Sequence, residues 1–502
     1  MSIWKLLVPQ LKDRLHASGC FDRGARFILF LFLINSLELG ANDSSNPASP
    51  FQRSVEPFLI QYCYDCHGDG MSRGKLAFDT YDSEASLVAD HTLWLAVLKN
   101  VRAGIMPPHQ RPQPTADEIQ ALVDWIKYEA FRIDPANPDP GRVTLRRLNR
   151  VEYRNTIRDL MGIDYNTLEE FPPDDTGYGF DTVGDVLTIS PLLFEKYLQA
   201  AETIVDKSVP KTAANKPDRF FFEGAPPPDP EARHTYARQI LERFANRAFR
   251  RPVDQATIDR LTALAETIYS EPDGSFETGV RQAMIAILAS PRFIFRIEGS
   301  PPVQAGEAHS PLDEYALASR LSYFLWSTMP DPELIDLAQR GELRRNLARQ
   351  VDRMIRDRRS DALIESFAGQ WLQARDVEGV SLNERAVLRR EGQNRRLELD
   401  RSLRLAMRQE SELYLAHILR EDRPILELLD SNYTFLNEKL AEFYGVPGVE
   451  GNKMRRITLP PDSPRGGVLT MGTLLTVTSN PTRTSPVKRG MFILDNILGT
   501  PP

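Results

Sequence analysis

The feature that most constrains this chain is the pentapeptide CYDCH, which runs from Cys63 to His67. It holds two of the three cysteines and one of the seven histidines in the sequence. Two thiols three positions apart can meet the two vinyl groups on one edge of a porphyrin, and the adjacent histidine then falls beneath the iron. The pattern therefore predicts one covalently attached haem c, bonded to Cys63 and Cys66, with His67 as the proximal iron ligand.

Two other kinds of site use closely spaced cysteines. A zinc site needs four Cys or His ligands, and the sequence offers no second cysteine pair, because the remaining cysteine is Cys20. A thioredoxin-like dithiol needs a strand–helix context and rarely carries the histidine. Three cysteines in 502 residues also exclude a disulfide scaffold. Haem attachment is the interpretation that the sequence favours.

The segments on both sides of the pentapeptide read as amphipathic helices. Before it, the segment FQRSVEPFLIQYC places apolar residues on one side, namely Val55, Phe58, Leu59 and Tyr62. After it, Thr115 and Glu118 form the capping box of a second helix. The apolar face of that helix consists of Ile119, Leu122, Val123 and Ile126. A small haem domain uses two such helices as its N- and C-terminal elements.

The distal ligand of the iron is expected to be Met106, in the segment VRAGIMPP. Its neighbours are glycine and two prolines, which indicates a stiff loop rather than a helix. A methionine ligand raises the haem potential relative to a second histidine. His109 would give bis-histidine ligation instead, and His91 is a weaker alternative at the start of a helix. Met71 is too close to His67 in sequence to reach the other side of the haem.

The N-terminus carries an export signal. Arg23 and Arg26 precede an apolar run, Phe27 to Leu37, and small and polar residues follow, with a plausible cleavage site after Ala41. The run is shorter than the roughly 20 apolar residues of a transmembrane helix, so no stable membrane span is expected. An uncleaved, weakly anchored segment is the alternative. Since c-type haem is attached on the far side of the membrane, we expect a periplasmic or secreted protein.

Length and proline clusters indicate several domains, and apolar residues at helical spacing along most of the chain indicate a mainly α fold. The chain exceeds what one hydrophobic core usually organises, and proline clusters mark linkers. Its net charge of −7 and pI near 5.7 argue against binding to nucleic acid. We predict a signal peptide (1–41), a linker (42–50), a haem domain (51–133), a linker (134–142), a helical domain (143–208), a Pro-rich linker (209–230), helical domains (231–300 and 309–445) and the start of a C-terminal domain (460–502).

Longer motifs carry a family resemblance. With GKLAFDTYDS and GIMPP, segment 51–133 resembles a planctomycete-type cytochrome c domain. LRRLNRVEYRNTIRDLMGID, FANRAFRRPVD, LASRLSYFLWSTMPDPEL and TSNPTRTSPVKRGMFILDNILGTPP resemble its usual companion domains of unknown function. The resemblance implies a small cytochrome c-like helical domain followed by a multi-domain helical body. Such proteins usually continue further, so we expect a C-terminally truncated member.

Two segments outside the haem domain have residues suited to binding. The loop Asp174 to Asp185 has the glycine and aspartate spacing of part of a calcium loop, although Thr176 and Tyr178 are poor ligands. The alternative is a turn-rich surface loop whose aspartates cap helices. Segment 479–490 combines hydroxyls with basic residues and could hold an anion or a sugar carboxylate. Its alternative is a turn before a helix.

The sequence thus supports electron transfer with an unidentified redox partner protein. The resemblance carries no established reaction, only an association with polysaccharide breakdown, so carbohydrate is a further candidate partner. One alternative is a haem-dependent oxidoreductase with a substrate pocket in the helical body. Another is a glycan-binding protein of the cell surface. The sequence offers no Ser-His-Asp, paired-carboxylate or phosphate-loop signature, and we assign no catalytic residue.

Overall fold

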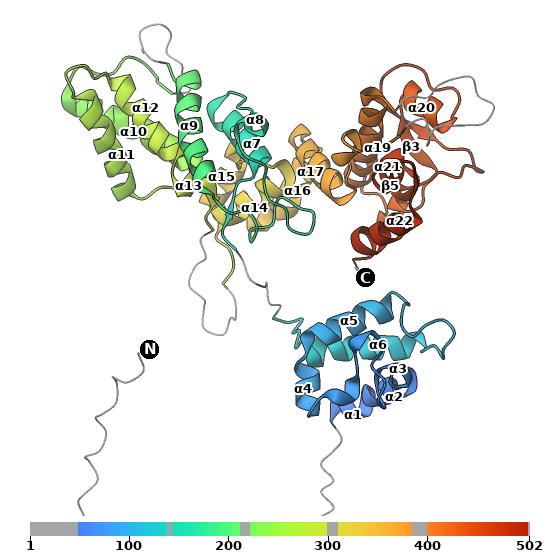
Figure 1. Cartoon of the computed structure of the whole chain (residues 1–502). Helices are drawn as coiled ribbons and strands as arrows, with labels where there is room; N and C mark the ends of the chain where they lie inside the picture. The colour runs from blue at the N-terminus through green and yellow to red at the C-terminus, as the bar shows by residue number, and fades with distance from the viewer. Residues whose placement is uncertain are drawn as a thin grey trace, which may run out of the picture. The chain divides into compact units, whose positions relative to one another are not determined.

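The structure is a computed structural model, and it describes residues 49–137, 141, 144–210, 221–298, 310–383 and 399–499. The chain divides into two compact units after Leu87, and each is described by itself (Figure 1). Helices dominate the described residues, and their strands form only two-stranded pairs, which confirms the mainly α fold. No helix in these ranges combines the length and apolar character needed to cross a bilayer. The predicted signal peptide lies outside the described residues.

The first unit is built from short helical segments around the pentapeptide. Ser49 begins α1 with a capping box to Gln52. The helix expected before the pentapeptide breaks at Val55, and Phe58 and Leu59 are buried with Val55 as predicted, while Tyr62 is only half-buried. The elements are α1 (Pro50–Ser54), α2 (Glu56–Tyr62), α3 (Tyr64–His67), the 3₁₀ turns η1 (Arg73–Lys75) and η2 (Phe78–Thr80), and α4 (Glu84–Ala89), which crosses the division.

The second unit begins with the helix pair that follows α4. The predicted capping box is confirmed: Thr115 Oγ1 accepts from the amide of Glu118 at 3.3 Å, and the Glu118 carboxylate accepts from the amide of Thr115 at 2.7 Å. Trp94 and Trp125 meet edge to face with ring centroids 4.8 Å apart. The elements are α5 (His91–Arg102), α6 (Ala116–Trp125) and η3 (Ile126–Ala130).

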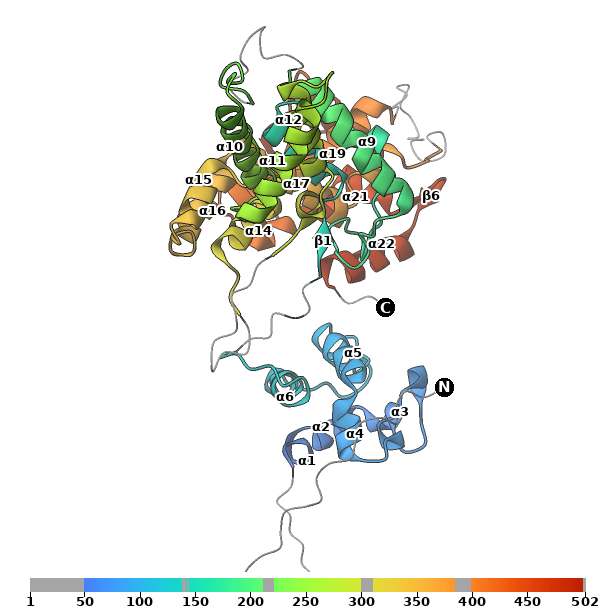
Figure 2. The same ribbon diagram turned by 90° about the vertical axis from the view of Figure 1, so that its left-hand side faces the viewer.

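One hydrophobic core spans the predicted helical domains 143–208 and 231–300. Most of its residues lie between Leu148 and Ile294, and it includes Phe221 and Phe222, which lie in the predicted Pro-rich linker. In it, α10, α11 and α12 lie side by side (Figures 1 and 2). The elements are β1 (Arg146–Arg147), α7 (Arg150–Met161), α8 (Thr167–Glu170), α9 (Pro191–Ser208), α10 (Pro230–Ala248), α11 (Gln255–Tyr269), α12 (Phe276–Leu288), α13 (Pro291–Ile294) and β2 (Phe295–Arg296), which pairs antiparallel with β1.

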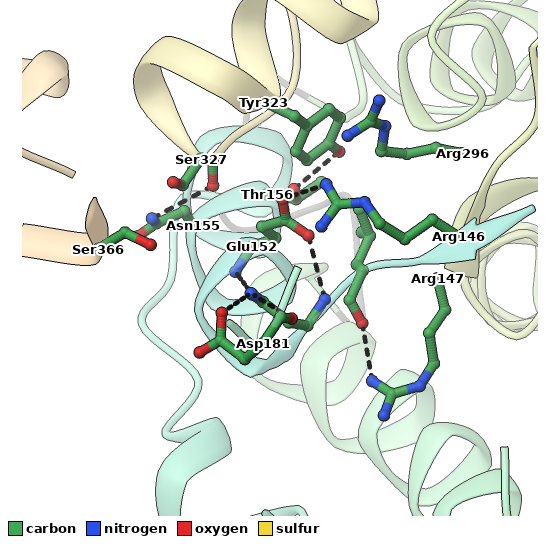
Figure 3. A network of polar contacts seen from close by, with 12 residues as sticks. Arg146, Arg147, Glu152, Asn155, Thr156, Asp181, Arg296, Tyr323, Ser327 and Ser366 are labelled. Carbon is green, nitrogen blue, oxygen red and sulfur yellow. Dashed lines mark hydrogen bonds and ion pairs between the residues drawn. The ribbon is translucent and has the colours of Figure 1, made fainter. Parts of the chain in front are cut away.

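Tyr323 joins this core to the segment that follows. It is buried in the same core, although it comes from α14 in the predicted domain 309–445. Its hydroxyl lies 3.0 Å from Thr156 Oγ1 of α7 and accepts from Arg250 Nη1 at 3.2 Å (Figure 3). Three predicted segments therefore meet at one phenol, and buried hydroxyls with such partners hold their elements in a fixed register.

A second cluster of apolar side chains surrounds Trp326, whose indole donates to the carbonyl of Met354 at 2.9 Å. The serine–proline pair at Ser310 and Pro311 predicts a helix start there. The helix begins at Glu314 instead, because the carboxylate of Asp313 accepts from the amide of Ala316 and makes Asp313 the N-cap. The elements are α14 (Glu314–Trp326), α15 (Pro332–Gln339), η5 (Arg344–Asn346), α16 (Leu347–Arg356), η6 (Arg358–Ser360), α17 (Asp361–Trp371) and η7 (Asp376–Glu378).

The last part packs around one long helix, α19. The segment NYTFLNEKLAEFYGV has apolar spacing that predicts one short helix. It divides into a strand and a helix instead, because Tyr433 pairs antiparallel with Thr458. The elements are α19 (Arg401–Arg420), η8 (Ile425–Leu428), β3 (Tyr433–Leu436), α20 (Glu438–Tyr444), β4 (Arg455–Thr458), η9 (Val468–Thr470), α21 (Gly472–Val477), β5 (Ser479–Asn480), β6 (Arg483–Thr484), α22 (Pro486–Phe492) and η10 (Ile493–Ile497).

Glu410 of α19 is buried in this part, with 1% of its surface exposed. Its carboxyl oxygens accept from Thr434 Oγ1 at 2.6 Å and from the Tyr444 hydroxyl at 2.5 Å. The guanidinium of Arg465 lies 3.6 Å from the centre of the Tyr444 ring. Burial raises the pKa of Glu410 to about 7, and the two hydrogen bonds and Arg465 oppose that rise.

Candidate haem site

The three motif side chains stand on one helical turn. Helix α2 ends and α3 begins at Cys63, whose carbonyl accepts from the amide of Cys66 at 3.1 Å and from that of His67 at 2.9 Å. Residues three and four positions apart on such a turn share a face. Both cysteines are free thiols and half-buried. The first unit therefore places two thiols and an imidazole on one turn. That these side chains hold a haem stays a prediction.

The backbone fixes which nitrogen of His67 can bind a metal. Nδ1 lies 3.2 Å from the carbonyl oxygen of Leu76. A carbonyl can only accept, so this contact favours the tautomer of the neutral imidazole with the proton on Nδ1, which leaves Nε2 as the acceptor nitrogen. Metal-binding histidines are commonly held in this way through the nitrogen that does not bind the metal. No motif in the sequence points to Leu76, because its carbonyl reaches His67 only through the turn after the pentapeptide.

Aromatic side chains support the turn. The ring of Phe78 meets the imidazole of His67 edge to face at 6.3 Å and lies parallel to the ring of Tyr64 at 6.2 Å. Directly after the motif, Gly68 packs against Tyr64 so closely that an added Cβ would lie 2.9 Å from Tyr64 Cγ. The turn therefore needs glycine at this position for lack of space, and its backbone is extended rather than left-handed.

The thiols are in an unfavourable setting for a thiolate. Burial, and then the neighbouring Cys66, raise the pKa of Cys63 to about 12. Redox-active dithiols and thiolate metal sites use cysteines whose pKa is lowered, which stabilises the anion. Among the described residues, no group of three or more His, Cys, Asp or Glu side chains is arranged to hold a metal ion. An uncharged thioether meets no such electrostatic penalty.

Met106 lies in a braced loop of the second unit. The amide of Met106 donates to the carbonyl of Asn100 at 3.2 Å, and Gln113 Nε2 donates to the carbonyls of Pro107 at 3.3 Å and Pro108 at 2.9 Å. The side chain of Met106 is 38% exposed. The loop is thus held by hydrogen bonds at both ends and leaves the thioether accessible. Since Met106 and His67 belong to different units, their pairing on one iron stays a prediction.

The alternative ligands have separate surroundings. His109 is exposed in the same loop as Met106. His91 is the first residue of α5, and its ring packs edge to face on Phe131 at 5.5 Å. Met71 is exposed in the loop that follows the motif. The contact with Phe131 gives His91 a packing role, and His109 stays the alternative to Met106.

Family comparisons bear on this geometry. Residues 63–110 match the family described as Planctomycete cytochrome C, and this match includes the motif and the Met106 loop. The chain carries a Planctomycete cytochrome C domain. Four families, each described as a protein of unknown function, match the remainder: DUF1587 at 146–210, DUF1595 at 236–298, DUF1592 at 312–446 and DUF1588 at 465–502. No curated protein and no solved structure matches the chain.

The residues of the Planctomycete cytochrome C domain fit a haem. Cys63 and Cys66 are reduced and stand on the same turn as His67, whose Nε2 is left available by the contact with Leu76. When bound, a haem c would supply one-electron redox chemistry. The four families of unknown function match the segments in which the sequence predicted companion domains. The resemblance to this cytochrome and its companions is therefore confirmed.

Two of the four aspartates in the loop 174–185, Asp174 and Asp181, are bound by basic and amide groups. Asp174 accepts from Arg147 Nη1 at 2.7 Å and from the amide of Arg150, the first residue of α7, at 2.8 Å. Asp181 accepts from Asn149 Nδ2 at 3.0 Å and from Arg375 Nη1 at 2.8 Å. These contacts favour the helix-capping interpretation over calcium, although both carboxylates are more buried than a surface loop implies.

The segment 479–490 forms a short hairpin followed by a helix. Ser485 Oγ accepts from the amide of Lys488 at 3.3 Å and begins α22. Arg489 Nη2 donates to Thr484 Oγ1 at 3.1 Å. The hydroxyls of Thr484 and Ser485 and the guanidinium of Arg489 therefore form hydrogen bonds within the segment. These local bonds favour the turn-before-helix interpretation.

Proposed function

We propose that this protein carries one covalent haem c and transfers single electrons as an exported protein. Cys63 and Cys66 form the thioether bonds, His67 is the proximal ligand, and Met106 is the distal ligand. The observation that carries the proposal is the contact between His67 Nδ1 and the Leu76 carbonyl, because it directs the proton away from Nε2. The match of residues 63–110 to Planctomycete cytochrome C supports it.

Each residue has a separate task in this proposal. The Leu76 carbonyl keeps the His67 imidazole in one tautomer and one orientation. Tyr64 and Phe78 exclude water from one side of the motif turn. Met106 supplies a thioether, which stabilises the reduced state relative to a second imidazole. The apolar run Phe27 to Leu37 supports export to the compartment in which such haems are attached.

The test is covalent haem staining of the full chain, expressed with a c-type haem attachment system. The wild type should keep its stain on a denaturing gel, and the double variant Cys63→Ser/Cys66→Ser should lose it. Cys20→Ser serves as the control, since Cys20 lies outside the motif, and should keep the stain. An unstained wild type, or a stained double variant, would refute covalent attachment.

A further inference from the structure

Three adjoining cavities cross the surface of the second unit. The largest, about 1030 Å³, shares the lining residues Asp159 and Arg359 with a cavity of about 560 Å³. On its other side it shares Asp361 and Glu365 with a cavity of about 450 Å³. Shared lining residues place the three cavities next to one another in a row, which we call the charged groove. An extended ligand fits such a shape better than a compact one.

Cross-segment hydrogen bonds fix the walls of the charged groove. Asn155 Nδ2 of α7 donates to the carbonyl of Ser327 at 3.3 Å, and Figure 3 shows this amide reaching across to the end of α14. The amide of Asp181 donates to Gln370 Oε1 at 2.6 Å, and the carboxylate of Asp181 accepts from Arg375 at 2.8 Å. The groove is therefore a built feature, set before any ligand arrives.

The lining is strongly charged, with an excess of positive groups. Twelve of its side chains are Arg or Lys and nine are Asp or Glu. Arg150, Arg154 and Arg158 follow one another along α7 at successive turns, over about 12 Å of helix. A positive excess here contrasts with the chain's net charge of −7. The groove therefore attracts negatively charged ligands, although the net charge of the chain as a whole is negative.

The mixture of positive and negative side chains further restricts the class of ligand that the charged groove can bind. Guanidinium groups donate and carboxylates accept, so alternating Arg and Asp side chains suit hydroxyl groups, which do both. A nucleic acid is disfavoured, because its dense phosphates would meet nine carboxylates. Its bases would also find few aromatic faces for stacking: Trp326 is 1% exposed and covered by Arg359, 3.5 Å from the ring centre, and Tyr315 is half-buried. The aromatic side chains of the lining are Trp326 and Tyr315.

We propose that the charged groove binds an acidic polysaccharide, a chain of hydroxyl-rich sugar rings that bear carboxylate or sulfate groups. The arginines pair with the acidic groups, and the interleaved carboxylates and amides bind the hydroxyls. This site lies in the companion domains and does not depend on the haem proposal.

Arg358 offers a clean test. It lines the largest cavity, its side chain is exposed, and within the described ranges its guanidinium makes no ion pair or hydrogen bond. Reversing its charge therefore removes nothing that holds the fold. Arg356 is the matched control, because it lies two residues away, is 75% exposed and does not line the groove.

The experiment measures binding to the haem-loaded full chain by isothermal calorimetry. The probes are alginate oligomers for carboxylate, dextran sulfate for sulfate, neutral dextran and a single-stranded oligothymidylate. We expect the wild type to bind one or both acidic glycans more tightly than dextran or the oligonucleotide. Arg358→Glu should weaken that binding by about tenfold, and Arg356→Glu should change it less than twofold.

Four results would overturn the assignment: no binding to either acidic glycan, dextran bound as tightly as alginate and dextran sulfate, tighter binding of the oligonucleotide, or equal losses in the two variants. The double variant Arg158→Glu/Arg358→Glu provides a second check and should lose more affinity than Arg358→Glu alone. Thermal melts of each variant confirm that the fold is kept. Loss of haem staining in the Cys63→Ser/Cys66→Ser chain should leave glycan binding unchanged, so the two proposals fail separately.

Discussion

Glu410 makes the stability of the second unit depend on pH. Its folded pKa is raised to about 7, above the ordinary value of 4.5. Between these values the unfolded chain has lost the proton and the folded chain keeps it, so folding takes up a proton and stability falls as pH rises. Below pH 4.5 both states are protonated, and above pH 7 both are ionised. The loss is therefore confined to this window.

The size of the effect follows from the two pKa values. Each pH unit in which the two states differ by one proton costs about 1.4 kcal/mol. The whole window thus amounts to about 3 kcal/mol, of which about 2–3 kcal/mol falls between pH 5 and pH 8. Glu410→Gln keeps the shape of the side chain and removes its titration. In that variant, this share of the pH dependence should disappear.

The assay is urea unfolding of the full chain, followed by circular dichroism at pH 5 and pH 8. The wild type should lose about 2–3 kcal/mol more than Glu410→Gln between these pH values. Glu421→Gln, at the exposed residue directly after α19, is the control and should behave like the wild type. If Glu410→Gln loses as much stability as the wild type, Glu410 is ionised inside the fold and the reasoning is wrong.

Three further predictions concern the distal ligand, the turn after the haem motif, and the buried ion pair between Arg147 and Asp174. Met106→His should lower the midpoint potential by on the order of 0.1 V in a redox titration, and an unchanged potential excludes Met106 as ligand. Gly68→Ala should lower the melting temperature of the haem-loaded chain, because the new Cβ lies 2.9 Å from Tyr64 Cγ and overpacking costs about 1–3 kcal/mol; an unchanged melt contradicts this. Asp174→Asn leaves the buried guanidinium of Arg147 without its carboxylate partner. It should lower the free energy of unfolding, measured in urea, by about 3 kcal/mol. Asp164→Asn, whose carboxylate is 58% exposed, should cost less than about 1 kcal/mol; equal costs refute the distinction.

Local signals predicted the helices well. The capping box of Thr115 is formed as expected, because it depends on residues within one helical turn. The pair Ser190 and Pro191 likewise predicts a helix start, and Ser190 caps α9. The start expected at Ser310 is wrong, since Asp313 offers a better acceptor three residues later. Competition between neighbouring caps is decided by packing, which a short sequence window does not contain.

Most of the features that the sequence could not predict depend on contacts between segments that are far apart in the chain. Tyr433 lies in a strand because Thr458 pairs with it from another segment, and the apolar spacing alone reads as a helix. Glu410 looks like a solvated position of α19 until α20 and β3 cover it. In the candidate site, the motif identified His67, but its orientation depends on the carbonyl of Leu76.

The position of Tyr323 bears on whether the parts of this chain can fold separately. The core that contains it draws side chains from the segments matching three families, at 146–210, 236–298 and 312–446. Removal of any one segment would uncover apolar surface on the others, and such surface promotes aggregation. We therefore expect none of the three segments to fold stably without the other two. Three families distinguished by sequence form one folding unit in this chain.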